Sequence, residues 1–279
     1  MKQGKRYQRM EETRAQVLRY AVALFLEQGY RETTLDQIAR RIDRTKGAVL
    51  RAYPDKEAIL YALVTHMFSA QFSGARSMLG DGADPLLVYA VETALQLHIC
   101  ELSESLRDLY TSAYTLPTTA DYIYRSTAQE LQQIFGKYLP SAALSDFYEL
   151  DLVSAGVMRG LMARRCDMYF PIEKKVALFL RCALKIYDVP VEEREAVISR
   201  VLAMDLAAMA HSTVDTSSTM YIINPVLKWQ LSLLTKSSSN HPPTLTMPGT
   251  MPYRTAATRM PLPTSDSNAP LVVAFLLLR

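Results

Sequence analysis

Prolines, glycines and capping residues divide this chain into a series of helices, and no segment alternates apolar and polar residues as a strand does. From Glu11 to Ala210 apolar residues recur at helical spacing, as in the stripe Val17, Ala21, Leu24 and Phe25. Residues that stop or start helices interrupt the pattern at Gly29, Asp84-Pro85, Leu116-Pro117, Pro140, Pro171 and Pro190. The pattern predicts an all-α fold.

The composition excludes several classes of protein. Hydrophobic residues make up 49% of the chain and charged residues 21%, which is ordinary for a soluble protein with a real core. The longest apolar run, Leu271–Leu278, is far shorter than the ~20 residues that span a bilayer. The N-terminus has no apolar stretch behind its basic residues, so it does not resemble a secretory signal. We expect a cytoplasmic protein of about two domains without membrane contact.

Charge is distributed unevenly along the chain. Residues 1–60 carry 13 Lys/Arg against 8 Asp/Glu, whereas residues 61–211 carry 13 against 18. A basic head on an acidic body indicates that the head meets a polyanion. Lys2, Lys5, Arg6 and Arg9, which precede the expected first helix, are either a phosphate-seeking arm or a solubilising end.

Residues 212–279 hold 8 of the 14 prolines and many Ser and Thr, which predicts a mostly disordered tail with one brief helix over Met220–Leu234.

The inventory of reactive side chains does not favour an enzyme or a metalloprotein. The chain lacks a G-x-S-x-G elbow, a P-loop, a GxGxxG and an H-E-x-x-H motif, and its four histidines lie far apart. Cys100, Cys166 and Cys182 form no metal-binding pattern, so we interpret them as free core thiols in a reducing compartment. His98 and Met158 are also interpreted as core residues. We expect no catalytic residue, no metal and no cofactor.

Two short helices with strong capping signals follow Gly29. Thr34 and Gln37 form a T-x-x-Q capping box that starts a helix with an apolar stripe at Leu35, Ile38, Ala39 and Ile42. After Asp43-Arg44, Thr45 caps a second helix over Lys46–Ala52, which Val49 and Tyr53 attach to the core. Such a pair predicts a helix-turn-helix, whose second helix enters the DNA major groove.

The second helix and its surroundings supply the candidate DNA contacts. Gly47 and Ala48 are small enough to let the helix backbone approach the base edges, and Lys56 lies in the first turn of a further helix that Asp55 caps, where free amides favour a phosphate. The predicted contact residues are Thr34, Arg44, Thr45, Lys46, Gly47, Ala48, Arg51, Tyr53 and Lys56.

Arg14–Phe68 resembles the DNA-binding domain of the TetR/AcrR family of transcriptional regulators. The residues that carry the resemblance are Ala21, Leu24-Phe25, Gly29-Tyr30, Thr33-Thr34, Ile38-Ala39, Lys46-Gly47, Tyr53-Pro54 and Lys56-Glu57. The resemblance implies residues 10–70 as a three-helix DNA-binding head, residues 71–211 as a larger helical bundle for ligand sensing and dimerisation, and residues 212–279 as a separate tail.

Three positions depart from the family pattern. The family usually has Gly-Val in the turn where this chain has Asp43-Arg44, and aromatic residues that contact DNA at the places of Leu50 and Ala52. The alternative to a sequence-specific regulator is therefore a dimerising interaction protein with a degenerate helix-turn-helix that no longer binds a specific operator. Arg44, Lys46 and Arg51 supply positive charge that compensates for the missing rings.

The body has the features of a sensor and a dimer interface. Tyrosines are frequent in it, and an amphipathic ring suits a ligand pocket, although any single tyrosine fits a half-buried surface position better. By resemblance, residues 146–168 and 172–187 build a homodimer interface in which Ala155, Gly156 and Gly160 permit close approach. The expected partners are double-stranded DNA, a second copy of the chain and a small-molecule effector, with no pocket residue assigned.

Overall fold

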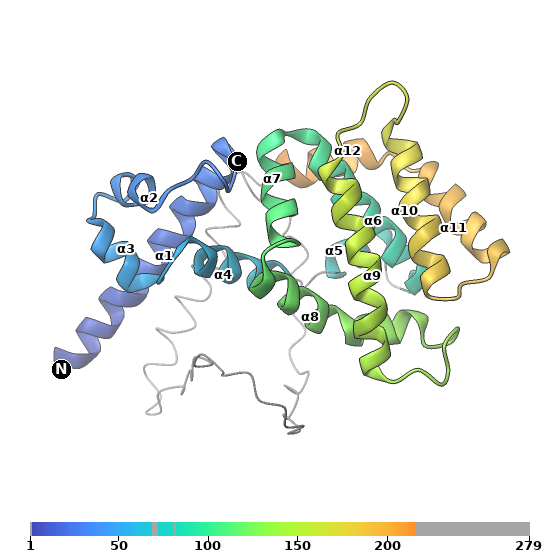
Figure 1. Cartoon of the computed structure of the whole chain (residues 1–279), viewed down its shortest axis with the longest axis horizontal. Coiled ribbons are helices and arrows are strands. Elements are labelled where there is room, and N and C mark those ends of the chain that lie inside the picture. The colour runs from blue at the N-terminus through green and yellow to red at the C-terminus, as the bar shows by residue number, and fades with distance from the viewer. Residues whose placement is uncertain (1, 69–71, 81, 216–279) are drawn as a thin grey trace.

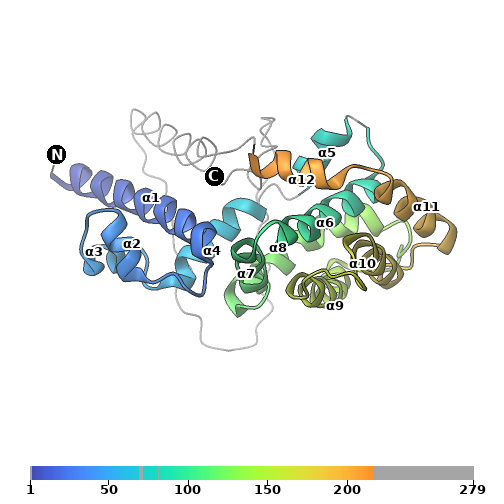
Figure 2. The same ribbon diagram turned by 90° about the horizontal axis from the view of Figure 1, so that it is seen from above.

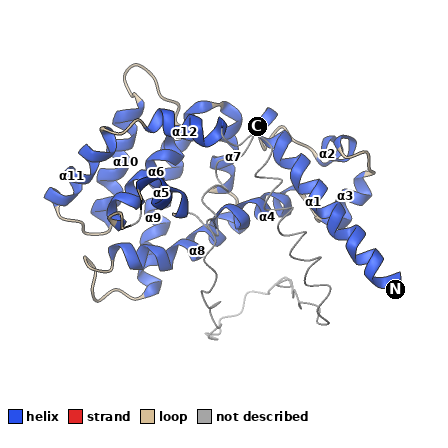
Figure 3. Cartoon of the chain, turned by 180° about the vertical axis from the view of Figure 1, so that it is seen from behind, coloured by secondary structure: helices blue, strands red, loops and turns tan. Residues whose placement is uncertain are grey.

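In the computed structural model, which describes residues 2–68, 72–80 and 82–215, twelve α-helices run in chain order and no strand is present among these residues (Figures 1 and 3). The head comprises α1 (Lys2–Gln28), α2 (Leu35–Arg41), α3 (Lys46–Ala52) and α4 (Lys56–Phe68). The body comprises α5 (Ser73–Leu79), α6 (Pro85–Leu102), α7 (Glu104–Ala113), α8 (Pro117–Phe135), α9 (Leu144–Ala163), α10 (Ile172–Ile186), α11 (Val191–Leu202) and α12 (Leu206–Asp215). The predicted all-α fold is confirmed.

The helix boundaries follow the local chemistry. Gly29 follows α1 with φ 91°, a left-handed conformation that glycine adopts without steric cost. Asp84 accepts a hydrogen bond from the Leu86 amide at 3.1 Å and starts α6 at Pro85. Pro117, Pro171 and Pro190 stand at the starts of α8, α10 and α11. These breaks lie where the sequence predicts them.

The structure corrects several details. Helix α1 begins at Lys2, so the basic N-terminal residues belong to the first helix instead of preceding it. Ser103, whose hydroxyl accepts from the Leu106 amide at 3.1 Å, adds an unexpected boundary between α6 and α7.

Of the three thiols only Cys100 is buried, while Cys166 and Cys182 are half-buried. His98 is likewise half-buried, whereas Met158 lies in the core.

The body is a bundle around one helix. Helix α6 is buried along most of its length, and it contacts α5, α7, α8, α9, α10, α11 and α12. Figures 1 and 2 show the head at one end of the molecule and α10 and α11 at the other. The predicted tail from residue 216 onward, including the expected helix over Met220–Leu234, lies outside the described residues, and residues 212–215 complete α12.

Head and body meet mainly along two pairs of helices. Helix α1 packs on α7, and α4 packs on α8. The Tyr122 hydroxyl on α8 donates to the Thr65 carbonyl on α4 at 3.3 Å, and the rings of Tyr61 and Tyr122 meet edge to face. The head therefore reaches the bundle through α7 and α8, two of the helices that also line the body's interior.

Candidate functional site

The turn between α2 and α3 has a left-handed residue at Asp43, with φ 52°. The Arg44 amide donates to the Ala39 carbonyl at 3.0 Å and closes the turn after α2. Glycine adopts this conformation most easily, and aspartate is one of the few other residues that tolerate it. The departure from the family's Gly-Val therefore preserves the turn at a modest conformational cost.

Helix α3 is attached to the head by one face and exposed on the other. The Thr45 hydroxyl accepts from the Ala48 amide at 3.3 Å and caps the helix, as predicted. Val49 and Ala52 are buried toward the core of the head. A Cβ added at Gly47 would meet only the Arg51 and Thr45 side-chain ends, at 3.7 and 3.9 Å, so this part of the helix is open to a large partner.

Six of the nine predicted contact residues are exposed and Ala48 is half-buried. The exposed six are Thr34, Arg44, Thr45, Lys46, Gly47 and Arg51. Leu50, which stands where the family usually has an aromatic ring, is also exposed and places an apolar side chain on this surface. In contrast, Ala52 is buried and has no access to a partner.

Lys46 is not free on this surface. Its ammonium lies 2.7 Å from the Asp36 carboxylate on α2, and both side chains are about half exposed. An exposed pair of this kind contributes only about 0–1 kcal/mol, so a phosphate competes with it readily. Sequence reasoning missed Asp36, although its position one residue after the start of α2 would have identified it as an acid at the N-terminal end of the helix-turn-helix.

Tyr53 and Lys56 point inward, so their side chains are engaged within the head. Tyr53 is 5% exposed and packs under the Arg14 guanidinium at 4.7 Å. The Lys56 ammonium donates to the main-chain carbonyls of Tyr30, Arg31 and Thr33 at 2.7, 3.2 and 2.8 Å, and desolvation lowers its pKa. The side chain that we assigned to a phosphate therefore holds the 30–33 loop in this structure.

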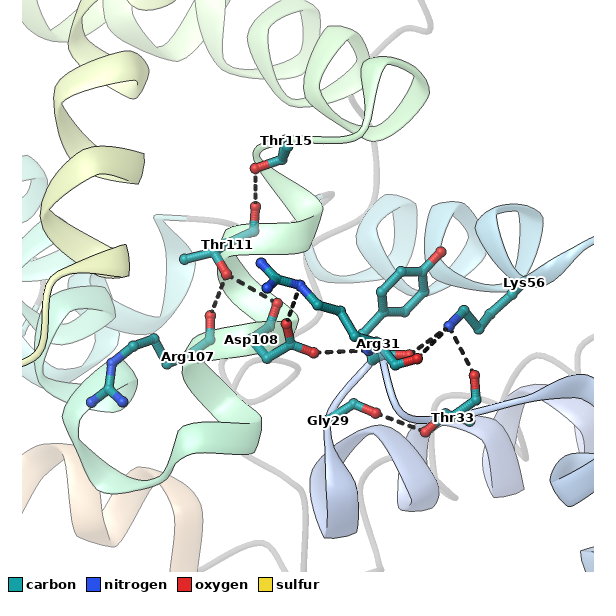
Figure 4. A network of polar contacts seen from close by, with 9 residues as sticks. Gly29, Arg31, Thr33, Lys56, Arg107, Asp108, Thr111 and Thr115 are labelled. Carbon is teal, nitrogen blue, oxygen red and sulfur yellow. Dashed lines mark hydrogen bonds and ion pairs between the residues drawn. The ribbon is translucent and has the colours of Figure 1, made fainter.

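The same loop is held from the body side by Asp108 on α7 (Figure 4). One Asp108 oxygen lies 2.9 Å from Arg31 Nε, and the other accepts from the Arg31 main-chain amide at 2.9 Å. A Cβ at Gly29 would lie 3.0 Å from that second oxygen, in addition to the strain of its positive φ. No sequence signal identified this contact, because it joins residues 77 positions apart.

A small cavity lies in the body among α6, α8, α9 and the end of α7. Its volume is about 30 Å³, which is enough for one or two water molecules. Aromatic and apolar side chains form most of the wall, and Asp151, Ser154, Thr127, Gln96 and Tyr114 bring polar groups to it. The full lining is Phe72, Tyr89, Thr93, Gln96, Tyr114, Ile123, Thr127, Leu131, Asp151, Ser154, Ala155, Met158 and Phe179.

The polar groups of the cavity are joined by hydrogen bonds. Thr127 and Ser154 donate to the two Asp151 carboxylate oxygens at 2.6 and 2.9 Å. The Tyr114 hydroxyl donates to Gln96 at 3.0 Å, and Gln96 donates to the Glu92 carboxylate at 3.2 Å. Burial raises the pKa of Asp151 to about 6 and that of Glu92 to about 7. A cavity of this kind selects ligands by hydrogen bonding and charge.

A capped, exposed short helix that follows a tight turn within the four-helix head is the arrangement of a helix-turn-helix. The family model "Bacterial regulatory proteins, tetR family" matches residues 17–63. The head of this chain is therefore similar to the DNA-binding domain of TetR-family regulators.

Two curated relatives match the head region. The HTH-type transcriptional regulator YuxN of Bacillus subtilis (strain 168) is 28% identical over 93 residues, which are 33% of this chain and 32% of that protein. The HTH-type transcriptional regulator TcmR of Streptomyces glaucescens is 32% identical over 83 residues, 30% of this chain and 36% of that protein. The chain therefore spans about a third of the length of the curated relatives it matches.

A solved structure shares the fold over most of the chain. RolR in complex with resorcinol is 17% identical, with a TM-score of 0.56 over 70% of this chain and 96% of that protein. At this identity the likeness concerns the fold, and it extends beyond the head into the body. No helix in the ranges that the structure describes is long and apolar enough to cross a membrane.

Proposed function

We propose that this chain is a transcriptional repressor that binds a palindromic operator as a homodimer and releases it when a small molecule enters the body cavity. The observation that carries the proposal is the exposed face of α3, where Arg44, Thr45, Lys46 and Arg51 stand beside the open Gly47. Cations and a hydroxyl around a closely approachable helix suit phosphates and base edges in a major groove.

A surface on α9 and α10 that is exposed among the described residues supports dimerisation. Leu152, Val153 and Leu178 are exposed, and nothing lies within 4 Å of the place that a Cβ would occupy at Gly156 or Gly160. We call these five residues the α9–α10 face. They fall within the predicted interface of residues 146–187. Ala155, which we also expected there, is buried and lines the cavity instead.

A dimer suits the geometry of DNA. Two α3 helices related by a two-fold axis would meet successive major grooves about 34–36 Å apart, which is why we propose a palindromic site. The apolar side chains and open glycines of the α9–α10 face allow two copies of each helix to approach closely and bury that surface.

Helix α7 supports the proposed ligand response, because it connects the cavity to the head. Its C-cap residue Tyr114 lines the cavity, and Asp108, one and a half turns earlier, holds Arg31 in the head. A ligand that displaces Tyr114 would shift α7 and with it the loop before α2. A coupling of 1–3 kcal/mol would weaken operator binding about 5- to 150-fold.

The proposal is tested by selecting bound duplexes from a random pool with the full chain, then screening small molecules by thermal shift. We expect a two-fold symmetric consensus, and we expect compounds that raise the melting temperature to release the selected duplex. Stabilising compounds that leave DNA affinity unchanged would overturn the ligand response. A chain that dimerises but selects no sequence would be the interaction protein with a degenerate helix-turn-helix.

A further inference from the structure

Several polar side chains in the wall of the body cavity offer hydrogen-bond acceptors. The Tyr114 hydroxyl hydrogen is directed to Gln96, that of Thr127 to Asp151, and that of Thr93 to the Tyr89 carbonyl at 2.9 Å. Their lone pairs remain available, as do those of the Asp151 carboxylate. Among the residues that the structure describes, no Lys, Arg or His lines the cavity. A ligand that brings its own donors can therefore bond to these oxygens.

The acids near the cavity have no basic partner in the described part of the chain. Asp151 is 8% exposed and Glu92 is 7% exposed, yet neither forms an ion pair there. Both acquire raised pKa values mainly because burial disfavours the carboxylate. A cation inside the cavity would relieve this penalty by pairing with Asp151.

The apolar wall suits the same kind of ligand. Tyr89, Tyr114, Phe72 and Phe179 surround the cavity, and the negative face of an aromatic ring attracts an organic cation. Met158 on α9 also lines it and is unbranched, so it repacks easily around different shapes. A ligand larger than two water molecules would have to displace some of these side chains, and Met158 would repack most easily.

We propose that the cavity binds a small organic ammonium ion, a primary amine on an apolar or aromatic body, with its N–H groups on Asp151 and its carbon skeleton among the rings of Phe72, Tyr89 and Phe179. This assignment deepens the proposed function, because it names the class of the effector. A neutral alcohol of the same shape brings one donor and no charge, so it gains less from the buried acid.

The test compares amines with alcohols of matched shape on the full chain by calorimetry at pH 7.5. The series runs from ethylamine and ethanol to benzylamine and benzyl alcohol. We expect the wild type to bind the best amine about tenfold or more tightly than its alcohol. Asp151→Asn should abolish that preference, and Glu149→Gln, which neutralises an exposed acid on the same helix, should retain it. An alcohol that binds as tightly as its amine, or the absence of binding by every amine at millimolar concentration, would overturn the assignment.

A second measurement on the wild type covers the case in which Asp151→Asn fails to fold. Lowering the pH from 7.5 to 5 protonates Asp151, so amine binding should weaken several-fold while alcohol binding stays constant. Glu92 has a pKa of about 7, so it also gains a proton as the pH falls from 7.5 to 5. The pKa values of Tyr89, Tyr114, Tyr124 and Tyr187 are all raised above the usual value for tyrosine, so these hydroxyls keep their protons over this range. Amine binding that does not change with pH would contradict the pairing.

Failure of this assignment is distinguishable from failure of the ligand response. An amine that binds through Asp151 but leaves the selected duplex bound would sink the ligand response and leave the cation site intact. If only neutral compounds release the duplex, the ligand response would stand and the assignment of a cation site would be wrong.

Discussion

Asp108 holds Arg31 with both oxygens of its carboxylate, one on the guanidinium and one on the main-chain amide, each at 2.9 Å. The contact joins α7 of the body to the loop that leads into α2 of the head. Lys56 holds the same loop from the other side through three main-chain carbonyls. The position of the helix-turn-helix therefore depends on a body helix that reaches the cavity.

Removing the carboxylate should weaken the junction more than removing the guanidinium. Asp108→Ala loses both contacts of a group that is 17% exposed, and we expect a loss of about 1–3 kcal/mol of stability. Arg31→Ala keeps the main-chain hydrogen bond to Asp108 and loses only the exposed ion pair, so we expect a loss of about 0–1 kcal/mol of stability. Urea unfolding of both variants measures the order. Equal stabilities for the two variants would show that the Arg31 amide contributes nothing.

Binding of DNA should respond in opposite directions to the two members of the Lys46–Asp36 pair. Lys46→Ala removes a cation at the groove and should cost about 1–3 kcal/mol of operator binding. Asp36→Asn frees the Lys46 ammonium and removes a negative charge close to the phosphates, so it should tighten binding severalfold at low salt. Fluorescence anisotropy measures both, with Arg200→Ala at an exposed position on α11 as the control. Weaker binding by Asp36→Asn, with its fold intact, would mean that the ion pair positions Lys46 instead of competing for it.

Capping residues and prolines made the helical elements predictable, because their chemistry acts within a few residues. The Thr34 capping box, the Thr45 cap over Lys46–Ala52 and the Asp84-Pro85 start all lie where the sequence places them. The exposed residues of α3 were predictable for the same reason, since Val49 fixes the buried face of a seven-residue helix. The hydrogen bonds of the Lys56 ammonium were not predictable, because their acceptors are main-chain carbonyls more than twenty residues away in the sequence.

The cavity and the Asp108 contact could not be predicted from patterns either. Asp151, Gln96 and Tyr114 come from three different helices, and only tertiary packing brings them together. Ala155 shows the same limit on a single helix. It adjoins Gly156 in the sequence, yet it faces the interior while Gly156 faces outward, because neighbouring residues on a helix point about 100° apart.

Stability should fall as the pH rises through the titration of Glu92. Between pH 4.5 and about 7 the folded chain holds the Glu92 proton and the unfolded chain does not. Because the unfolded state then binds fewer protons, the free energy of unfolding falls as the pH rises through this range. Glu92→Gln removes the buried charge and should be about 1–3 kcal/mol more stable than the wild type at pH 8, with no gain at pH 4. Melting temperatures at both pH values test this, and Glu149→Gln serves as the exposed control. A gain of the same size at both pH values would exclude a titrating Glu92.

Gly156→Leu should separate the proposed dimer without harming the protomer. Nothing lies within 4 Å of a Cβ at Gly156, and leucine favours a helix over glycine by up to about 1 kcal/mol. In a closely packed interface the added side chain would cost about 1–3 kcal/mol by overpacking. Light scattering at micromolar concentration should report a dimer for the wild type, a weaker dimer for Gly156→Ala and a monomer for Gly156→Leu. A Gly156→Leu dimer as tight as the wild type would place the interface elsewhere.

Sequence-specific DNA binding through α3 is tested most directly by titrating the full chain into its selected duplex and into a random duplex over a range of salt concentrations. We predict that the selected duplex binds at least ~10³-fold more tightly at physiological salt, and that Lys46→Ala lowers the salt slope by about one. Equal affinity for the two duplexes, or a slope that Lys46→Ala does not change, would contradict the proposed DNA-binding role of α3.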